Sequence, residues 1–109
     1  MIQNVRYFLM LCEERHFGRA AKRCGIAQPS LTNAIKRLEG AVGGRLFERT
    51  RSSTSLTTPT SLAWAVKPWF EQALSALERA QTIAREHHAD KLLARSLAAA
   101  ESSNRIETT

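Results

Sequence analysis

The chain is poor in residues that bind metals or form covalent links, with only two cysteines and three histidines among 109 residues. Cys12 and Cys24 lack the paired spacing of a zinc site. Both fall on apolar faces of separate predicted helices, so we expect buried, reduced thiols rather than a redox switch. His87 and His88 are adjacent and point about 100° apart on a helix, which is poor for joint ligation. We therefore expect no metal and no cofactor.

The chain also lacks a long hydrophobic run. No segment approaches the roughly 20 apolar residues that a membrane-spanning helix needs. Arg6, Glu13 and Glu14 interrupt the first apolar stretch, so the N-terminus does not have the pattern of a secretory signal peptide. The positive residues are dispersed and form no polybasic run of the kind that binds acidic membranes. We therefore expect a cytoplasmic protein with no membrane partner.

Catalytic patterns are equally scarce. The sequence contains no nucleophile–base pair, no phosphate-cradling glycine loop and no pair of carboxylates suited to acid–base chemistry. His16 stands alone in a predicted loop, where we expect a solvated side chain. The sequence thus predicts a protein that is not an enzyme and has no catalytic residues.

Positive charge is in excess, and it is unevenly placed. The chain has a formal net charge of +6. Residues 1–57 hold ten Lys or Arg against four Asp or Glu, whereas residues 58–109 hold six of each. A basic excess confined to one half of the chain is the electrostatic footprint of a nucleic-acid-binding domain. A basic surface that merely helps solubility is the competing explanation.

After a first amphipathic helix over residues 2–14, residues 18–40 predict two helices joined by a tight turn. The first covers residues 18–24. The second begins at Pro29, since a missing N–H costs nothing at the first helical position. Gly25 suits the turn because glycine tolerates a positive φ. Apolar residues recur at helical spacing on one side of the second helix: Leu31, Ala34, Ile35 and Leu38. This layout is typical of a helix that enters the DNA major groove.

The rest of that second helix carries side chains that can contact DNA. Asn and Gln can pair with adenine, Arg and Lys with guanine, and Ser or Thr with either. Backbone N–H groups at a helix start also favour a phosphate. The DNA-binding candidates are Gln28, Pro29, Ser30, Thr32, Asn33, Lys36 and Arg37. An ordinary amphipathic surface helix is the alternative interpretation.

A short basic hairpin and a long helix follow. Gly43 and Gly44 break the preceding helix, and residues 46–57 form the hairpin. The long helix should begin near Pro59, capped by Thr58, and run to about residue 88, roughly 45 Å. Pro68 lies inside it and should bend it.

This helix carries two apolar stripes, of which one can pack on the body and the other is available to a second subunit. The dimerisation stripe follows a 4–3 alternation: Leu62, Val66, Trp69, Ala73, Ala76, Ala80 and Ile83. The neighbouring line contains Val66, Phe70, Leu74 and Leu77. A monomeric helix with an unusually apolar face is the alternative, but an exposed patch that contains Trp69 would be a liability.

Together these segments resemble the LysR-type transcriptional regulators over about residues 1–88. The Gln-Pro and Leu-Phe-x-Arg segments are specific to that family. The matching residues are Arg6, Tyr7, Phe8, Phe17, Ala20, Ala21, Gln28, Pro29, Ser30, Leu31, Thr32, Ile35, Leu38, Glu39, Gly43, Leu46, Phe47, Arg49, Arg51, Leu56 and Thr57.

The resemblance implies a mainly α fold in three parts. Residues 1–58 would be a winged helix-turn-helix of three helices and a short β-hairpin wing, and residues 59–88 a linker and dimerisation helix. The third part, residues 89–109, lies beyond the resemblance: its Ala- and Leu-rich composition predicts a short helix over residues 90–101, which either extends the long helix or folds back as a fifth, and a disordered tail over residues 102–109. The ligand-sensing domain of the family has no counterpart here. By resemblance, Gln28, Pro29, Ser30, Thr32 and Asn33 meet the major groove or its flanking phosphates, and Arg49 and Arg51 of the wing reach the backbone or minor groove.

The chain departs from the family pattern at several positions. Gly18 stands where a Ser or Thr commonly caps the second helix, which predicts a weak cap. Cys24 replaces the usual leucine. Asn33 replaces a common arginine, so the family's target sequences cannot be carried over.

The sequence therefore predicts a sequence-specific transcriptional regulator that binds double-stranded DNA as a homodimer. Two recognition helices in successive major grooves, about 34 Å apart, require an interrupted inverted repeat. Phosphate charge would come from Lys22, Arg23, Lys36, Arg37, Arg45, Arg49 and Arg51. Two alternatives stay open: a module that heterodimerises with a full-length relative and modulates it, and a non-specific architectural DNA binder. The polar face with Thr32 and Asn33 favours specificity.

Overall fold

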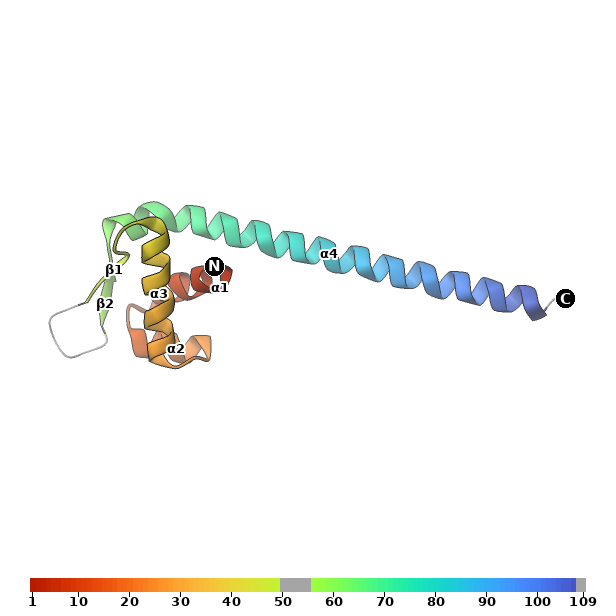
Figure 1. Cartoon of the computed structure of the whole chain (residues 1–109), viewed down its shortest axis with the longest axis horizontal. Helices are drawn as coiled ribbons and strands as arrows, with labels where there is room; N and C mark the ends of the chain where they lie inside the picture. Colours follow the sequence, from red (N-terminus) through yellow and green to blue (C-terminus); the bar gives the residue numbers. More distant parts are fainter. Residues whose placement is uncertain (50–55, 108–109) are drawn as a thin grey trace. The chain divides into compact units, whose positions relative to one another are not determined.

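The computed structural model describes residues 1–49 and 56–107. Three helices, α1 (Ile2–Glu14), α2 (Phe17–Cys24) and α3 (Gln28–Val42), precede a hairpin of β1 (Phe47–Arg49) and β2 (Thr57–Pro59). Helix α4 (Ser61–Glu107) follows (Figure 1). This order confirms the predicted mainly α fold with a short hairpin wing and a long last helix. The chain divides into two units, Met1–Leu74 and Ser75–Thr109.

The core of the first unit lies where α1, α2 and α3 meet the hairpin. Phe8 is fully buried, and its ring centroid lies 5.6 Å from that of Phe47 and 5.3 Å from that of Phe70. This one ring therefore connects α1 to the hairpin and to the first turns of α4. The core comprises Val5, Phe8, Leu11, Cys12, Phe17, Ala20, Ala21, Leu31, Ile35, Leu38, Leu46, Phe47 and Ala63.

Each of the first three helices ends at a residue with positive φ. Gly25 and Gly43 have φ values of 71° and 79°, the region that glycine enters without a Cβ penalty. Among the residues that the structure describes, Arg15, with φ 54°, is the non-glycine residue that has a positive φ. Its carbonyl accepts a hydrogen bond from the Thr57 N–H at 3.0 Å, and its guanidinium carbon lies 5.7 Å from the centroid of the Trp64 ring. The α1–α2 turn is thus held by both the hairpin and α4.

The hairpin is antiparallel and short. Phe47 pairs with Pro59 and Arg49 with Thr57. The Thr57 hydroxyl donates to the carbonyl of Glu48 at 2.7 Å. The carboxylate of Glu39 on α3 accepts from the Leu46 N–H at 2.7 Å. The first of these side-chain bonds joins the two strands, and the second holds the start of the hairpin against α3.

Helix α4 differs from its prediction at both ends. It begins at Ser61, because Pro59 is paired in β2. Thr60, not Thr58, is its cap: the Thr60 hydroxyl accepts from the Ala63 N–H at 3.2 Å. The helix continues to Glu107, so the helix predicted over residues 90–101 is an extension of α4 and not a separate fifth helix. The end predicted near residue 88 is wrong, and so is the disordered tail over residues 102–107. The sequence there has no glycine or proline to stop it.

Over the described ranges, the helices are all too short or too polar to span a bilayer. The bend predicted at Pro68, which lies inside α4, stays a prediction.

Candidate nucleic-acid interface

Helix α3 separates its two sides as predicted. Leu31, Ala34, Ile35 and Leu38 are buried against the body. The candidate DNA contacts occupy the remaining surface: Gln28, Pro29, Ser30, Asn33, Lys36 and Arg37 are exposed, and Thr32 is half-buried. Ala27 is the N-cap, so Pro29 takes the second helical position, one later than predicted. The helix therefore presents one continuous polar surface beginning at its N-terminal turn.

Four of the predicted contact residues surround one shallow depression at the start of α3. Gln28, Pro29, Thr32 and Asn33 line it, and its volume is about 400 Å³. We call these four residues the start surface. The sequence had predicted them as members of one helix face, and the structure brings them together around one hollow.

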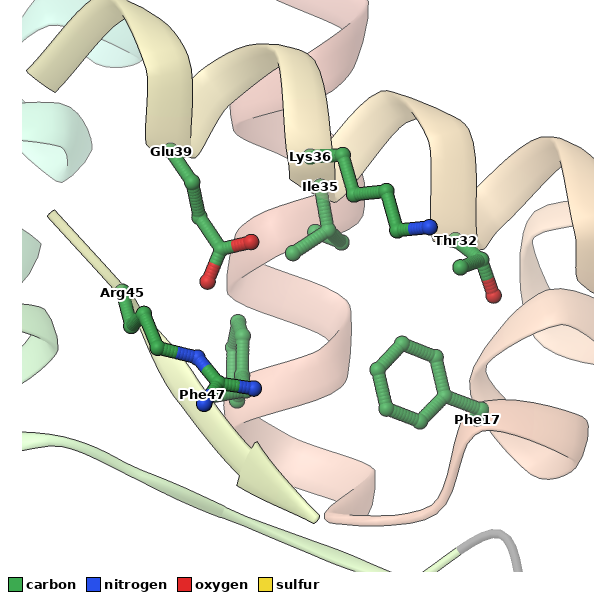
Figure 2. Close-up of a pocket in the computed structure, with 7 residues that line it drawn as sticks. All are labelled: Phe17, Thr32, Ile35, Lys36, Glu39, Arg45 and Phe47. Carbon is green, nitrogen blue, oxygen red and sulfur yellow. The ribbon is translucent and has the colours of Figure 1, made fainter. Parts of the chain in front are cut away.

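A second depression lies between α3 and β1, and it shares Thr32 with the start surface. Its volume is about 340 Å³. Figure 2 shows Lys36 reaching over it from α3 and Arg45 from the segment before β1. Its apolar walls come from Phe17, Ile35 and Phe47, which are buried elsewhere against the core. We call this the helix–wing groove.

The helix–wing groove combines two cationic side chains, Lys36 and Arg45, with apolar walls. Lys and Arg bind phosphate oxygens, which position a protein on DNA without reading its sequence. Glu39 also lines the groove, but its carboxylate is engaged by the Leu46 N–H. Sequence reasoning named Lys36 and Arg45 as cations but missed the groove, since its walls come from α2, α3 and β1. The signal for this groove in the sequence was the presence of two phenylalanines, Phe17 and Phe47, close to basic residues.

Arg23 is engaged in an ion-pair cluster, and its predicted contribution to phosphate binding stays a prediction. Its guanidinium lies 2.8 Å from one carboxylate oxygen of Glu14 and 3.7 Å from Glu13. Arg19 adds a second bond to Glu14 at 3.3 Å. The hydrogen bond from Arg23 lowers the pKa of Glu14 and, in return, raises the pKa of Arg23. This exposed cluster joins the end of α1 to α2, and its contribution to stability is small.

The cap of α2 also differs from its prediction. His16, not residue 18, is the N-cap, and its ring Nδ1 accepts a hydrogen bond from the Arg19 N–H at 2.9 Å. The cap expected at residue 18 and the solvated His16 are therefore wrong, since His16 is half-buried and is itself the cap, while the strength of the cap stays a prediction. Ser, Thr, Asp and Asn are the usual capping residues, so a histidine in this role carries little signal at the level of sequence.

The wing arginines can be placed only in part. Arg49 is the last residue of β1 and pairs with Thr57. Arg51 lies outside the described residues.

The predicted dimerisation stripe divides into two sets. Leu62 and Val66 are half-buried and pack with Phe70 against the core of their own chain, and their part in dimerisation stays a prediction. The other members are exposed: Trp69 (68%), Ala73, Ala76, Ala80 and Ile83 (54%). Exposed apolar residues that the prediction did not include follow further along α4: Leu92, Leu93 and Leu97.

The cysteines are free thiols. Cys12 is buried, and desolvation raises its pKa to about 11. Cys24 is half-buried, and desolvation raises its pKa as well. A high pKa disfavours the reactive thiolate. The described part of the chain brings together no cluster of three or more His, Cys, Asp or Glu that could hold a metal ion.

Comparison with known proteins gives a consistent result. Residues 2–60 match the family model for "Bacterial regulatory helix-turn-helix protein, lysR family". The HTH-type transcriptional regulator BudR of Klebsiella aerogenes is 43% identical over 77% of this chain and 59% of its own length. The chain thus spans less than two thirds of that relative.

Two solved structures share this fold. The crystal structure of a CbnR DBD–DNA complex superposes with a TM-score of 0.71 at 25% identity, over 78% of this chain and 94% of that one. A full-length OxyR variant from Pseudomonas aeruginosa superposes with a TM-score of 0.70 at 30% identity, over 78% of this chain and 28% of its own.

Proposed function

Because the chain belongs to the LysR family of bacterial regulatory helix-turn-helix proteins, we propose that it regulates transcription by binding double-stranded DNA sequence-specifically as a dimer. The observation that carries the proposal is the start surface, where Gln28, Pro29, Thr32 and Asn33 surround one exposed depression at the first turn of α3. Amide and hydroxyl groups clustered in this way can pair with base edges in the major groove. The likeness to a CbnR domain solved in complex with DNA supports double-stranded DNA as the partner.

We assign base reading mainly to Thr32 and Asn33, with Gln28, Pro29 and Ser30 at the groove edge. Lys36, Arg37 and Arg45 supply phosphate contacts, the first and last of them from the helix–wing groove. Arg49 and Arg51 belong to the wing and contact the backbone or the minor groove. Lys22, exposed in the last turn of α2, adds to the attraction for phosphates.

We assign dimerisation to the exposed apolar positions of α4. Trp69 and Ala73 lie in the first unit, and Ala76, Ala80 and Ile83 in the second. Large apolar side chains on a helix surface favour a protein partner, and the small alanines permit its close approach. A second copy of the chain supplies the matching stripe. Two copies then present two copies of α3, which suits an interrupted inverted repeat with half-sites about 34 Å apart. A cytoplasmic location, where such DNA is accessible, follows from this function.

The test is selection of a randomised duplex pool by the purified chain at near-physiological salt, followed by sequencing. Enrichment of an interrupted inverted repeat, with a dimer in sedimentation analysis, supports the proposal. Binding without enrichment indicates a non-specific architectural binder. A folded chain that fails to bind, yet pairs with a full-length relative, indicates the modulating module.

A further inference from the structure

His16 lies where α2, the hairpin and the start of α3 come together. Its ring caps α2 through the bond from the Arg19 N–H. Its backbone forms an antiparallel bridge with Leu56, next to the bond from the Thr57 N–H to the Arg15 carbonyl. One residue therefore joins α2 to the wing by two different kinds of contact.

Gly18 lies directly beneath the His16 ring. A Cβ placed on Gly18 would lie 2.9 Å from Cε1 and 3.3 Å from Nδ1 of His16, and 3.5 Å from the side-chain oxygen of Gln28. The first distance is shorter than real Cβ contacts, so the ring would have to move. The ring is held by its hydrogen bond, and moving it breaks the cap. Gly18 is not among the glycines with positive φ, so space, and not backbone conformation, requires glycine there.

We propose that His16 is a positioning residue of the DNA interface, and that Gly18 is glycine because the His16 ring occupies the space above it. The ring sets the first turn of α2 beside the Gln28 side chain of the start surface, while the His16 backbone pairs with Leu56, the residue that precedes β2 of the wing. Its effect on DNA rests on the proposed function, whereas the coupling between His16 and Gly18 does not.

The capping hydrogen bond determines which tautomer of the His16 ring is required. An Nδ1 that accepts a hydrogen bond carries no proton, so the neutral ring must hold its proton on Nε2. A serine at position 16 could accept the same bond from the third N–H of the helix with a much smaller side chain. His16→Ser should therefore keep the cap and free the space above Gly18, whereas His16→Ala loses the cap.

The test is a double-mutant cycle on the whole chain, followed by thermal unfolding. Gly18→Ala should lower Tm in the native background and raise it in the His16→Ser background, because alanine favours helix over glycine. The matched control is Gly40→Ala: Gly40 also lies within a helix, and a Cβ there would meet nothing within 4 Å. Its effect should be the same in both backgrounds. Equal effects of Gly18→Ala in both backgrounds would overturn the proposal.

Two further readouts separate positioning from bulk stability. Nitrogen NMR of the imidazole should show the proton on Nε2, and a proton on Nδ1 overturns the cap. Affinity for a mixed-sequence duplex of about three helical turns should fall severalfold for His16→Ala and be restored by His16→Ser. A folded His16→Ala chain with native affinity overturns the positioning role. If the native chain itself binds no duplex, the proposed function fails, while the Tm cycle still decides the coupling of His16 and Gly18.

Discussion

Replacing Glu39 by Gln should lower stability and raise DNA affinity at the same time. The Glu39 carboxylate accepts the N–H of Leu46, a fully buried residue, at 2.7 Å. A hydrogen bond to a charged group contributes about 1.5–3 kcal/mol and a neutral one about 0.5–1.5 kcal/mol. Glutamine keeps an acceptor but loses the charge, so Glu39→Gln should cost about 1 kcal/mol. In a domain of this size that loss lowers Tm by about 4–8 °C.

The same carboxylate opposes DNA binding through its place in the helix–wing groove. Glu39 lies there with Lys36 and Arg45 (Figure 2). Removing its negative charge strengthens the attraction of the groove for phosphates by an amount on the order of 1 kcal/mol, or roughly fivefold at low salt. Circular dichroism gives Tm, and fluorescence anisotropy with a mixed-sequence duplex at several salt concentrations gives affinity. The gain in affinity should shrink as salt rises.

Glu48→Gln is the matched control. Glu48 is exposed on β1, and its backbone carbonyl, not its side chain, accepts from the Thr57 hydroxyl. This variant should tighten DNA binding without lowering Tm. The reasoning is refuted if Glu39→Gln loses affinity along with stability, or if its Tm equals that of the native chain.

Three further predictions concern base reading, dimerisation and the buried thiol. Asn33→Ala should weaken binding to the selected operator by about 1–3 kcal/mol and leave mixed-sequence binding unchanged in anisotropy titrations; equal losses on both duplexes contradict base reading. Trp69→Glu should convert the dimer to monomer in sedimentation experiments, because a charge would be buried in the interface; a persistent dimer excludes Trp69 from it. Burial raises the pKa of the Cys12 thiol from 9.0 to about 11, so the unfolded chain releases this proton first and stability should fall as pH rises between those values. Denaturant titrations across that range should show the slope, and its survival in Cys12→Ala would exclude Cys12 as its cause.

Local patterns in the sequence were sufficient to predict the first three helices. Residues 2–14 carry a clear apolar periodicity, and α1 covers the predicted range. Gly43 ends α3 with a positive φ, as its place after the last periodic residues indicated. The division of α3 into a buried and an exposed side followed from the spacing of Leu31, Ala34, Ile35 and Leu38. In each case one short segment contains the whole signal.

The errors arose where distant segments decide the structure. Thr58 and Thr60 are both plausible caps, and only the pairing of Pro59 with Phe47 selects Thr60. Periodicity alone was sufficient to predict the apolar faces of α4. Which of these faces packs on the body depends on the position of Phe8, whose ring contacts Phe70. The helix–wing groove was missed for the same reason, because its lining residues come from α2, α3, β1 and the segment before β1.

The Thr60 hydroxyl anchors the first turn of α4. It donates to the Arg45 carbonyl at 2.7 Å and accepts from the Ala63 N–H at 3.2 Å, so a single oxygen joins the hairpin to the first turn of the helix. In the proposed dimer, this one oxygen would therefore connect the part of the chain that binds DNA to the start of the helix that holds the two copies together.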